Sequence, residues 1–391
     1  MQTATVVGGG IAGLAAALAL AQAGWRAVVL ERAAEFGEVG AGLAVTGNGM
    51  AALQAIGAAD AVRAAGHETV AAGYQDPGGR WLMRIPDDPG VRAVTVLLGI
   101  HRQRLHAALL QAARAADGVQ LINGAEVTAV APGQADGDHA GVTWHAGGER
   151  HSSESCLVVA ADGVRSSVRA QLFPAVRPAY SGSTSWRAVI HDTGFDGRLI
   201  EVWGPGSEFG SMRISEDEIY WYGYFRNPEG ASFSDELAAA RDYFSGWSPQ
   251  IRALVAATAP GQLIRNDVYH LPGGLPSYVR GRVVMIGDAA HATLPTAGGG
   301  ASTALEDGVC VGRLIAAPVC AGAGLATALA AFDQARRPRC RKIARLSVMI
   351  AAFGAGLGGG WRQPVRNGLL RLTPPRLAAR AGLPIVTWTA P

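Results

Sequence analysis

Charge is scarce in this sequence of 391 residues, and its scarcity excludes one class of partner. Charged residues make up only 17% of the chain, and the net charge of +3 is too small a surplus to indicate binding to nucleic acid. Lysine is nearly absent, since Lys342 is the only one; in a chain so rich in alanine and glycine we attribute this to codon bias.

Cysteine is also scarce, and its spacing argues against metal and redox motifs. The chain has no C-x-x-C pair, so neither a structural zinc site nor a dithiol redox pair is expected. We expect reduced thiols in a cytoplasmic protein. The cysteines are Cys156, Cys310, Cys320 and Cys340.

Long apolar runs are missing as well. The longest late run, residues 346–361, is rich in glycine and shorter than the ~20 residues that a membrane-spanning helix needs. Residues 1–25 superficially resemble a signal peptide, but they lack a basic start and are interrupted by regularly placed glycines. With 49% hydrophobic residues, the chain is predicted to be globular, with a membrane partner unlikely.

What is present begins with a glycine-rich turn near the N-terminus. Residues 5–7 form a short apolar strand, a helix is expected through Ala23, and residues 27–30 form a second strand that ends at Glu31. This order is typical of a βαβ unit. The glycines after the first strand fit G-x-G-x-x-G and are Gly8, Gly10 and Gly13.

Each glycine of this turn has a physical role in binding a dinucleotide. Gly8 makes the tight turn, Gly10 lets a pyrophosphate approach the backbone, and Gly13 lets the helix pack on the strand. The helix N-terminus offers free N–H groups to phosphates, and Glu31 is placed to accept hydrogen bonds from ribose. The motif predicts a dinucleotide and leaves FAD and NAD as alternatives.

Two later motifs help to choose between FAD and NAD. In the first, an apolar strand ends at Asp162 and a short helix begins near Ser166. In the second, a strand over residues 283–286 leads to Asp288, a loop, and a helix from about Gly300. Alone, each is an ordinary turn between a strand and a helix.

Together with an R-x-x-L-x-x-x-L segment formed by Arg102, Leu105 and Leu109, these motifs resemble the single-component (group A) flavin monooxygenases related to para-hydroxybenzoate hydroxylase. The resemblance covers nearly the whole chain. It implies an α/β fold with a Rossmann-like FAD-binding domain, an antiparallel substrate-binding sheet and C-terminal helices. The implied limits are residues 1–70, 99–178 and 269–330 for the FAD-binding domain, 71–98 and 179–268 for the sheet, and 331–391 for the helices.

The resemblance also implies how FAD is held. Asp288 would bind the ribityl chain, Arg102 would lie near the phosphates, and Asp162 would serve both flavin and nicotinamide binding. The family loop often reads P-x-x-G-Q-G-x-N, whereas here Gly299 and Ser302 replace the glutamine and the asparagine. The implied contacts are Gly8, Gly10, Ala12, Gly13, Glu31, Arg32, Arg102, Val127, Asp162, Asp288, Pro295, Gly298, Gly299, Gly300 and Ala301.

Candidate substrate residues lie in alternating, strand-like segments between the later motifs. Residues 219–225 place three tyrosines on one face of a strand and Trp221 and Phe225 on the other. Arg187 shares a face with Val189, and an inward arginine needs a hydrogen-bond acceptor. A plain aromatic core and a surface arginine remain alternatives. The candidates are Arg187, Arg198, Tyr222, Tyr224 and Pro295.

The reaction implied by the family starts with reduction of FAD by NADPH or NADH, which binds transiently. A flavin C4a-hydroperoxide formed with O2 then hydroxylates an aromatic or polyketide-like small molecule. No acid–base pair is evident, so the catalytic residues are left unknown. The alternatives are a lipid-directed flavin hydroxylase or epoxidase at a membrane surface and a non-catalytic flavin-fold binding protein.

One other reading of the last motif concerns metals. Asp288 and His291 are three residues apart, as metal ligands can be, but no third ligand of suitable spacing follows, so no metal is predicted. A hydrolase is equally disfavoured because no serine lies in a nucleophile elbow. The sequence leaves a monomer and a homodimer open.

Overall fold

The computed structural model of the protein describes residues 1–37, 40–86, 88–191 and 194–391. Its first layer is a six-stranded sheet with the order β17-β18-β11-β1-β2-β7. Within this sheet, only β17 runs antiparallel to its neighbour. The strands are β1 (Thr3–Val7), β2 (Arg26–Leu30), β7 (Val119–Ile122), β11 (Leu157–Ala160), β17 (Val279–Arg280) and β18 (Val283–Met285).

Two helices pack tightly against each other beside this sheet, α1 (Ile11–Gln22) and α10 (Gly300–Cys310). Their contact depends on small residues. A Cβ atom on Gly308 would lie 2.6 Å from the Cβ of Ala15, so only glycine lets the two backbones approach this closely. The fully buried face of α1 is therefore made largely of alanine.

A nine-stranded sheet forms the second layer, with the order β16-β12-β15-β14-β13-β4-β6-β3 and β5 beside β4. All its pairs are antiparallel except β13 with β4, which confirms the predicted antiparallel sheet. The strands are β3 (Gly42–Val45), β4 (His67–Gln75), β5 (Trp81–Arg84), β6 (Val96–His101), β12 (Ala179–His191), β13 (Leu199–Gly204), β14 (Ser207–Arg213), β15 (Glu218–Arg226) and β16 (Ile264–His270).

This sheet does not stop at the predicted domain limits. The limit between residues 70 and 71 falls inside β4, and the limit between 268 and 269 falls inside β16. Strand β3, which lies in the predicted FAD-binding part, ends the large sheet beside β6, and the predicted limit between residues 98 and 99 falls inside β6. The domain division stays a prediction, and the sheet is continuous across it.

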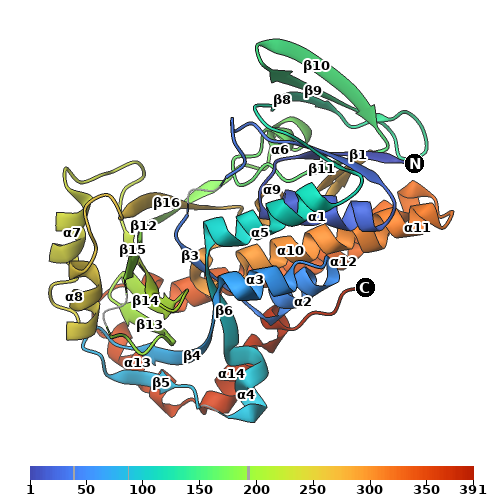
Figure 1. Ribbon diagram of the computed structural model, residues 1–391. Helices are drawn as coiled ribbons and strands as arrows, with labels where there is room; N and C mark the ends of the chain where they lie inside the picture. The colour runs from blue at the N-terminus through green and yellow to red at the C-terminus, as the bar shows by residue number, and fades with distance from the viewer. Residues whose placement is uncertain (38–39, 87, 192–193) are drawn as a thin grey trace.

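The two faces of the large sheet have different neighbours. Helices α7 (Glu236–Tyr243) and α8 (Pro249–Ala256) cover one face, where Trp186, Trp221 and Phe225 are buried. In Figure 1 these helices stand at the left edge, and α10 and α12 (Leu325–Phe353) lie on the other side of the sheet. The opposite face carries Tyr220, Tyr222 and Tyr224 and is called the tyrosine-bearing face below. It therefore lies on the side of the sheet where α10 and α12 are found.

The remaining elements complete the shell. A three-stranded sheet, drawn at the top of Figure 1, comprises β8 (Glu126–Ala131), β9 (Ala140–Ala146) and β10 (Glu149–Ser155). Among the described residues, no helix has the length and apolarity to cross a membrane. The other helices are α2 (Gly47–Ala55), α3 (Ala59–Ala65), α4 (Pro89–Thr95), α5 (Arg102–Ala115), α6 (Ser167–Leu172), α9 (Asp288–His291), α11 (Ala317–Cys320), α13 (Arg362–Leu372) and α14 (Pro375–Val386).

Candidate active site

The N-terminal turn between β1 and α1 can be built only with glycine at two of its positions. Gly8 has φ +103°, and a Cβ on it would lie 2.5 Å from the carbonyl oxygen of Ala161. A Cβ on Gly13 would lie 1.9 Å from the carbonyl oxygen of Gly8. The tight turn at Gly8 and the close helix packing at Gly13 are confirmed. Gly10 caps α1 with no side-chain hydrogen bond to the helix, so its first N–H groups are available to a ligand.

The carboxylate of Glu31 faces this turn. It accepts a hydrogen bond from the Gly9 N–H at 2.7 Å and another from the Ala33 N–H at 2.9 Å. The ring Nε2 of buried His106, on α5, lies 2.8 Å from the carbonyl oxygen of Gly9 and holds the next peptide of the turn. Sequence analysis missed His106, because a lone histidine on a helix carries no motif. Arg32 is exposed beside Glu31.

Arg102 begins α5, as the R-x-x-L-x-x-x-L segment requires. His101 caps the helix through its ring Nδ1, and the Arg102 N–H donates to the carbonyl of Ala41. Leu105 and Leu109, three and seven residues further along the helix, are fully buried. The segment therefore places the arginine at a helix start and two leucines in the core.

The Asp-Gly motif is joined to the Gly-Asp motif by an arginine that sequence analysis did not single out. Asp162 accepts hydrogen bonds from the Ser166 hydroxyl and the Val168 N–H, so its carboxylate holds the start of α6. Arg169, which is buried, donates to the carbonyls of Val164 and Ala289. Val127 lies in β8, next to a bulge in its pairing with β9.

The Gly-Asp loop presents polar groups at the end of a buried strand. Asp288 is exposed although its neighbours in β18 and α9 are buried. A short 3-10 turn, Pro295–Ala297, leads to Gly298 with φ +60°, and α10 then begins at Gly300. The N-terminus of α10 has neither a capping side chain nor an acid in its first turn, Ala301 included. Its free N–H groups suit an electron-rich ligand edge.

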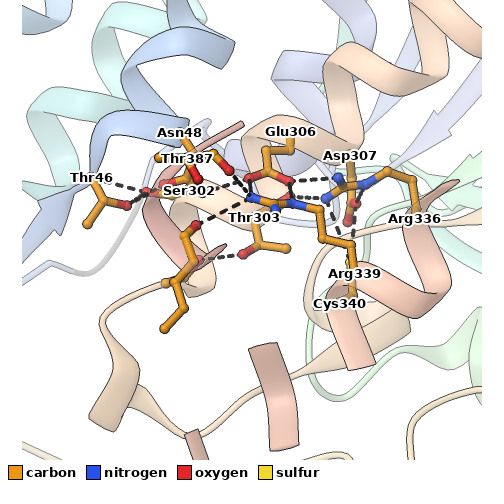
Figure 2. A network of polar contacts seen from close by, with 12 residues as sticks. Thr46, Asn48, Ser302, Thr303, Glu306, Asp307, Arg336, Arg339, Cys340 and Thr387 are labelled. Carbon is orange, nitrogen blue, oxygen red and sulfur yellow. Dashed lines mark hydrogen bonds and ion pairs between the residues drawn. The ribbon is translucent and has the colours of Figure 1, made fainter. Parts of the chain in front are cut away.

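Behind this loop lies a buried ion network that ties α9 and α10 to α12 (Figure 2). Asp307 accepts from His291 at 2.5 Å, from the Gly287 N–H at 2.9 Å and from Arg336 at 2.7 Å. Burial opposes both charges, yet the neighbouring Cys340 and Asp307 raise the pKa of His291, and His291 and Arg336 hold the pKa of Asp307 well below its usual range. Buried ion pairs and hydrogen bonds of Asp307 therefore hold the Gly-Asp loop in place.

A second carboxylate of α10 extends the network. Glu306 forms ion pairs of 2.6 Å with both Arg336 and Arg339, and it accepts a hydrogen bond from the Asn48 amide at 2.7 Å. Ser302, which replaces the family asparagine, accepts from the Thr46 hydroxyl at 2.9 Å. Figure 2 places these side chains in one row across α2, α10 and α12.

The network contains a third candidate metal ligand that the sequence spacing did not reveal. The fold brings Asp307 and Cys340 to His291, with candidate ligand atoms within 4.8 Å of one another, although sequence spacing offered no third ligand. However, Arg336 lies 2.7 Å from Asp307 and 3.7 Å from the sulfur of Cys340. A guanidinium that occupies these ligand atoms is incompatible with a cation among them. The absence of a metal stays a prediction.

On the tyrosine-bearing face of the large sheet, Arg187 lies as its alternation predicted. Val189 shares this face, whereas Trp186 packs on the opposite one. The Arg187 guanidinium donates to the Tyr224 hydroxyl at 3.1 Å. The ring of Tyr220 packs on Gly42 of β3, where a Cβ would lie only 2.3 Å from the ring. This contact brings the face next to the strand that leads to Thr46.

Arg198 has a different environment. It precedes β13 and pairs with Asp196 at 2.7 Å, and its side chain is 38% exposed. The geometry gives it a surface partner outside the tyrosine-bearing face, so we do not carry it forward as a substrate residue. Tyr222 donates to the carboxylate of Glu201 at 3.2 Å, and this carboxylate was not expected from sequence.

These features fit FAD. Helix α1 begins at the glycine turn without a side-chain cap, helix α10 begins without one after the Gly298 turn, and exposed Asp288 follows a buried strand. A pyrophosphate, a flavin edge and a ribityl chain need these three kinds of group.

Comparisons with known proteins agree with this fit. The sequence profile of the FAD binding domain family matches residues 1–347. Aurachin C monooxygenase/isomerase of Stigmatella aurantiaca is 34% identical over 357 residues, 90% of this chain and 89% of that protein. The 2-heptyl-3-hydroxy-4(1H)-quinolone synthase of Pseudomonas aeruginosa is 34% identical over 384 residues, 95% and 94% of the two chains.

Among solved structures, Klebsiella pneumoniae HpxO with FAD and uric acid matches with a TM-score of 0.86. The match covers 98% of this chain and 96% of that one at 24% identity, and it supports the same fold. The comparisons give no support to the membrane-directed enzyme or the non-catalytic binding protein. The chain belongs to the single-component FAD-dependent aromatic hydroxylases related to para-hydroxybenzoate hydroxylase, and it is an FAD-dependent monooxygenase.

Proposed function

We propose that the protein uses NADPH or NADH to hydroxylate an electron-rich aromatic or heteroaromatic small molecule. One atom of O2 enters the ring as a hydroxyl group and the other leaves as water, while the nicotinamide cofactor is oxidised. FAD supplies the redox and oxygen chemistry when it is bound. The protein then has three tasks, which are to hold FAD, to orient the ring and to exclude water.

Residues of the glycine turn and of the two Asp motifs would hold the cofactor. Gly10 and the N-terminus of α1 would take the pyrophosphate, and Asp288 the ribityl chain. The uncapped N-terminus of α10, with Gly298 and Gly299 before it, would lie against the flavin ring and favour negative charge there. The ion network under α10 would keep this edge in place.

The observation that carries the substrate proposal is the position of the tyrosine-bearing face. It lies opposite α7 and α8, and Tyr220 packs on β3, whose following residue Thr46 hydrogen-bonds to Ser302 in the first turn of α10. Tyr222, Tyr224 and Arg187 would therefore orient an aromatic ring close to the flavin loop.

The proposal is tested by turnover. Purified protein should carry one FAD per chain, and a panel of phenols, hydroxypyridines and quinolones should include compounds that stimulate NADPH or NADH oxidation and gain one oxygen by mass spectrometry. Protein with full FAD content that hydroxylates none of these classes would refute the proposed function.

A single substitution tests the cofactor assignment. Asp288→Ala removes the exposed carboxylate without a packing change, so flavin content after gel filtration should fall at least about ten-fold, the loss expected for a charge-assisted hydrogen bond. Asp60→Ala, which alters an exposed acid on α3, is the matched control and should keep its flavin. Full flavin content in Asp288→Ala would exclude this role.

A further inference from the structure

The tyrosine-bearing face contains buried polar groups that lack partners. Glu208 on β14 is 1% exposed, and neither of its carboxyl oxygens is hydrogen-bonded to another described residue. The Arg187 Nε and the Trp203 Nε1 are also buried without a partner in the part of the chain that the structure describes. Such groups are rare because each costs the full free energy of desolvation.

Strand register brings these groups together. Glu208 is the cross-strand neighbour of Tyr224 on one side and of Trp203 on the other. Arg187 donates to the hydroxyl of the same Tyr224 at 3.1 Å. The unpartnered acceptor on β14 therefore lies between an unpartnered N–H donor on β13 and the tyrosine that Arg187 contacts from β12.

A second row of cross-strand neighbours, beside these groups, explains why the Tyr222 hydroxyl binds Glu201 and not Glu208. Tyr222, Gly210, Glu201 and Tyr74 lie in register across four adjacent strands. Gly210 has no side chain, so the Tyr222 ring lies over it and the Tyr222 hydroxyl reaches Glu201. Glu201 thus has a partner, whereas neither carboxyl oxygen of Glu208, one row away, is hydrogen-bonded to a described residue. The Tyr222 hydroxyl still lies near enough to Glu208 to oppose the rise in its pKa.

Burial also sets the protonation of the two carboxyls. It raises the pKa of Glu201 to about 7, and it raises the pKa of Glu208 well above its usual range, helped by the charge of Glu201. The raised pKa of Glu208 favours its neutral form, in which the carboxyl offers a carbonyl acceptor next to a hydroxyl donor. A neutral carboxyl matches a ligand edge that carries a donor beside an oxygen.

We infer that Glu208 and Arg187 form the polar end of the substrate site and recognise an aromatic ring with an N–H or O–H donor next to an oxo or hydroxy oxygen. Glu208 accepts the donor proton in a hydrogen bond, and Arg187 Nε donates to the oxygen. The chemical class is an oxo- or hydroxy-substituted nitrogen heterocycle. This inference rests on the proposed function and adds to it the edge by which the ring is selected.

The test measures equilibrium binding to the FAD-loaded protein through the change in flavin absorbance. The probes are 2(1H)-quinolone, whose N–H donor lies next to its oxo oxygen, and 1-methyl-2-quinolone, which lacks the donor. The wild type should bind the N–H probe about ten- to a hundred-fold more tightly, because the methylated probe leaves Glu208 unpaired.

Two variants separate recognition from steric fit. Glu208→Gln keeps an acceptor of the same size, so it should retain the preference within about three-fold. Glu208→Leu removes the acceptor and should bind both probes equally. Since Leu also removes an unsatisfied buried group, its FAD content and its midpoint of thermal unfolding should be no lower than those of the wild type.

Each other outcome has a distinct meaning. A Leu variant that keeps the preference, or that loses FAD or stability, would show that Glu208 has a steric or structural role and overturn the inference. Equal binding of the probes by the wild type, or binding of neither by a protein that hydroxylates another aromatic class, would overturn the inference and leave the proposed function intact. Failure to hydroxylate any aromatic would refute the proposed function itself.

Discussion

At the scale of single residues, the site depends on side chains that are absent as much as on those present. Gly8 and Gly13 let the backbone of the N-terminal turn pack closely, and their roles were predictable because the G-x-G-x-x-G spacing is local. Gly210 has a comparable role beneath Tyr222, but no local pattern marks a single glycine in an aromatic strand. Its role follows only from the register of β14 with β15.

Gly210→Ala tests this role. The new Cβ would lie 2.2 Å from the Tyr222 ring, so the ring must move and its hydrogen bond to Glu201 must break. We expect a loss of about 1–3 kcal/mol in the free energy of unfolding, measured by urea denaturation. Gly141→Ala in β9, where the nearest atom lies 3.6 Å away, is the control and should be neutral or slightly stabilising. Equal effects of the two changes would contradict the account.

Glu201 should make stability depend on pH. The folded-state pKa of about 7 lies above the usual value of roughly 4.3, so the folded protein holds this proton more tightly than the unfolded chain does. The free energy of unfolding should therefore fall as pH rises from about 4 to 7. Glu201→Gln removes this fall, so the variant should gain about 1–3 kcal/mol relative to the wild type across that window. A difference that does not change with pH would exclude the titration of Glu201.

At the scale of elements, strands and helices adjacent in sequence were well predicted, and their distant partners were not. The βαβ unit, the helix from Gly300 and the alternating faces of β15 are confirmed, because each follows from local periodicity and spacing. The pairing of the short strands β3 and β6 at the end of the large sheet was not predicted, since a four- or six-residue apolar strand does not specify its partner. The network of Asp307 and Arg336 joins helices that are separate in sequence, so spacing could not reveal it.

Asp307 is the charge that connects these elements. Asp307→Asn would leave His291 and Arg336 close together in a buried site without their shared carboxylate. We expect a loss of about 3–5 kcal/mol in the free energy of unfolding. Asp60→Asn, which breaks the exposed pair with Arg63, should cost less than about 1 kcal/mol. A cost for Asp307→Asn as small as that of the control would mean that the network contributes little to stability.

At the scale of the whole molecule, the proposed cofactor contacts come from segments spread over residues 8–301. Protein stripped of flavin should therefore gain stability when FAD returns, by about 2.7 kcal/mol at a concentration one hundred times the Kd. FMN, which lacks the adenylate half, should raise the thermal midpoint less because the βαβ unit stays empty. An equal rise with FMN, measured by differential scanning fluorimetry, would argue against binding of adenosine diphosphate at the N-terminal turn.

The order of strands in the six-stranded sheet has a consequence for synthesis. β1 leaves the ribosome well before its neighbour β11, which ends at Ala160, and before the next strand, β18, which ends at Met285. At translation rates of about 5–20 residues per second, the glycine turn and the apolar helix α1 wait roughly 15–60 s for these partners. The glycine turn is thus made long before the strands that complete its sheet, and during that interval α1 is a natural target for chaperones.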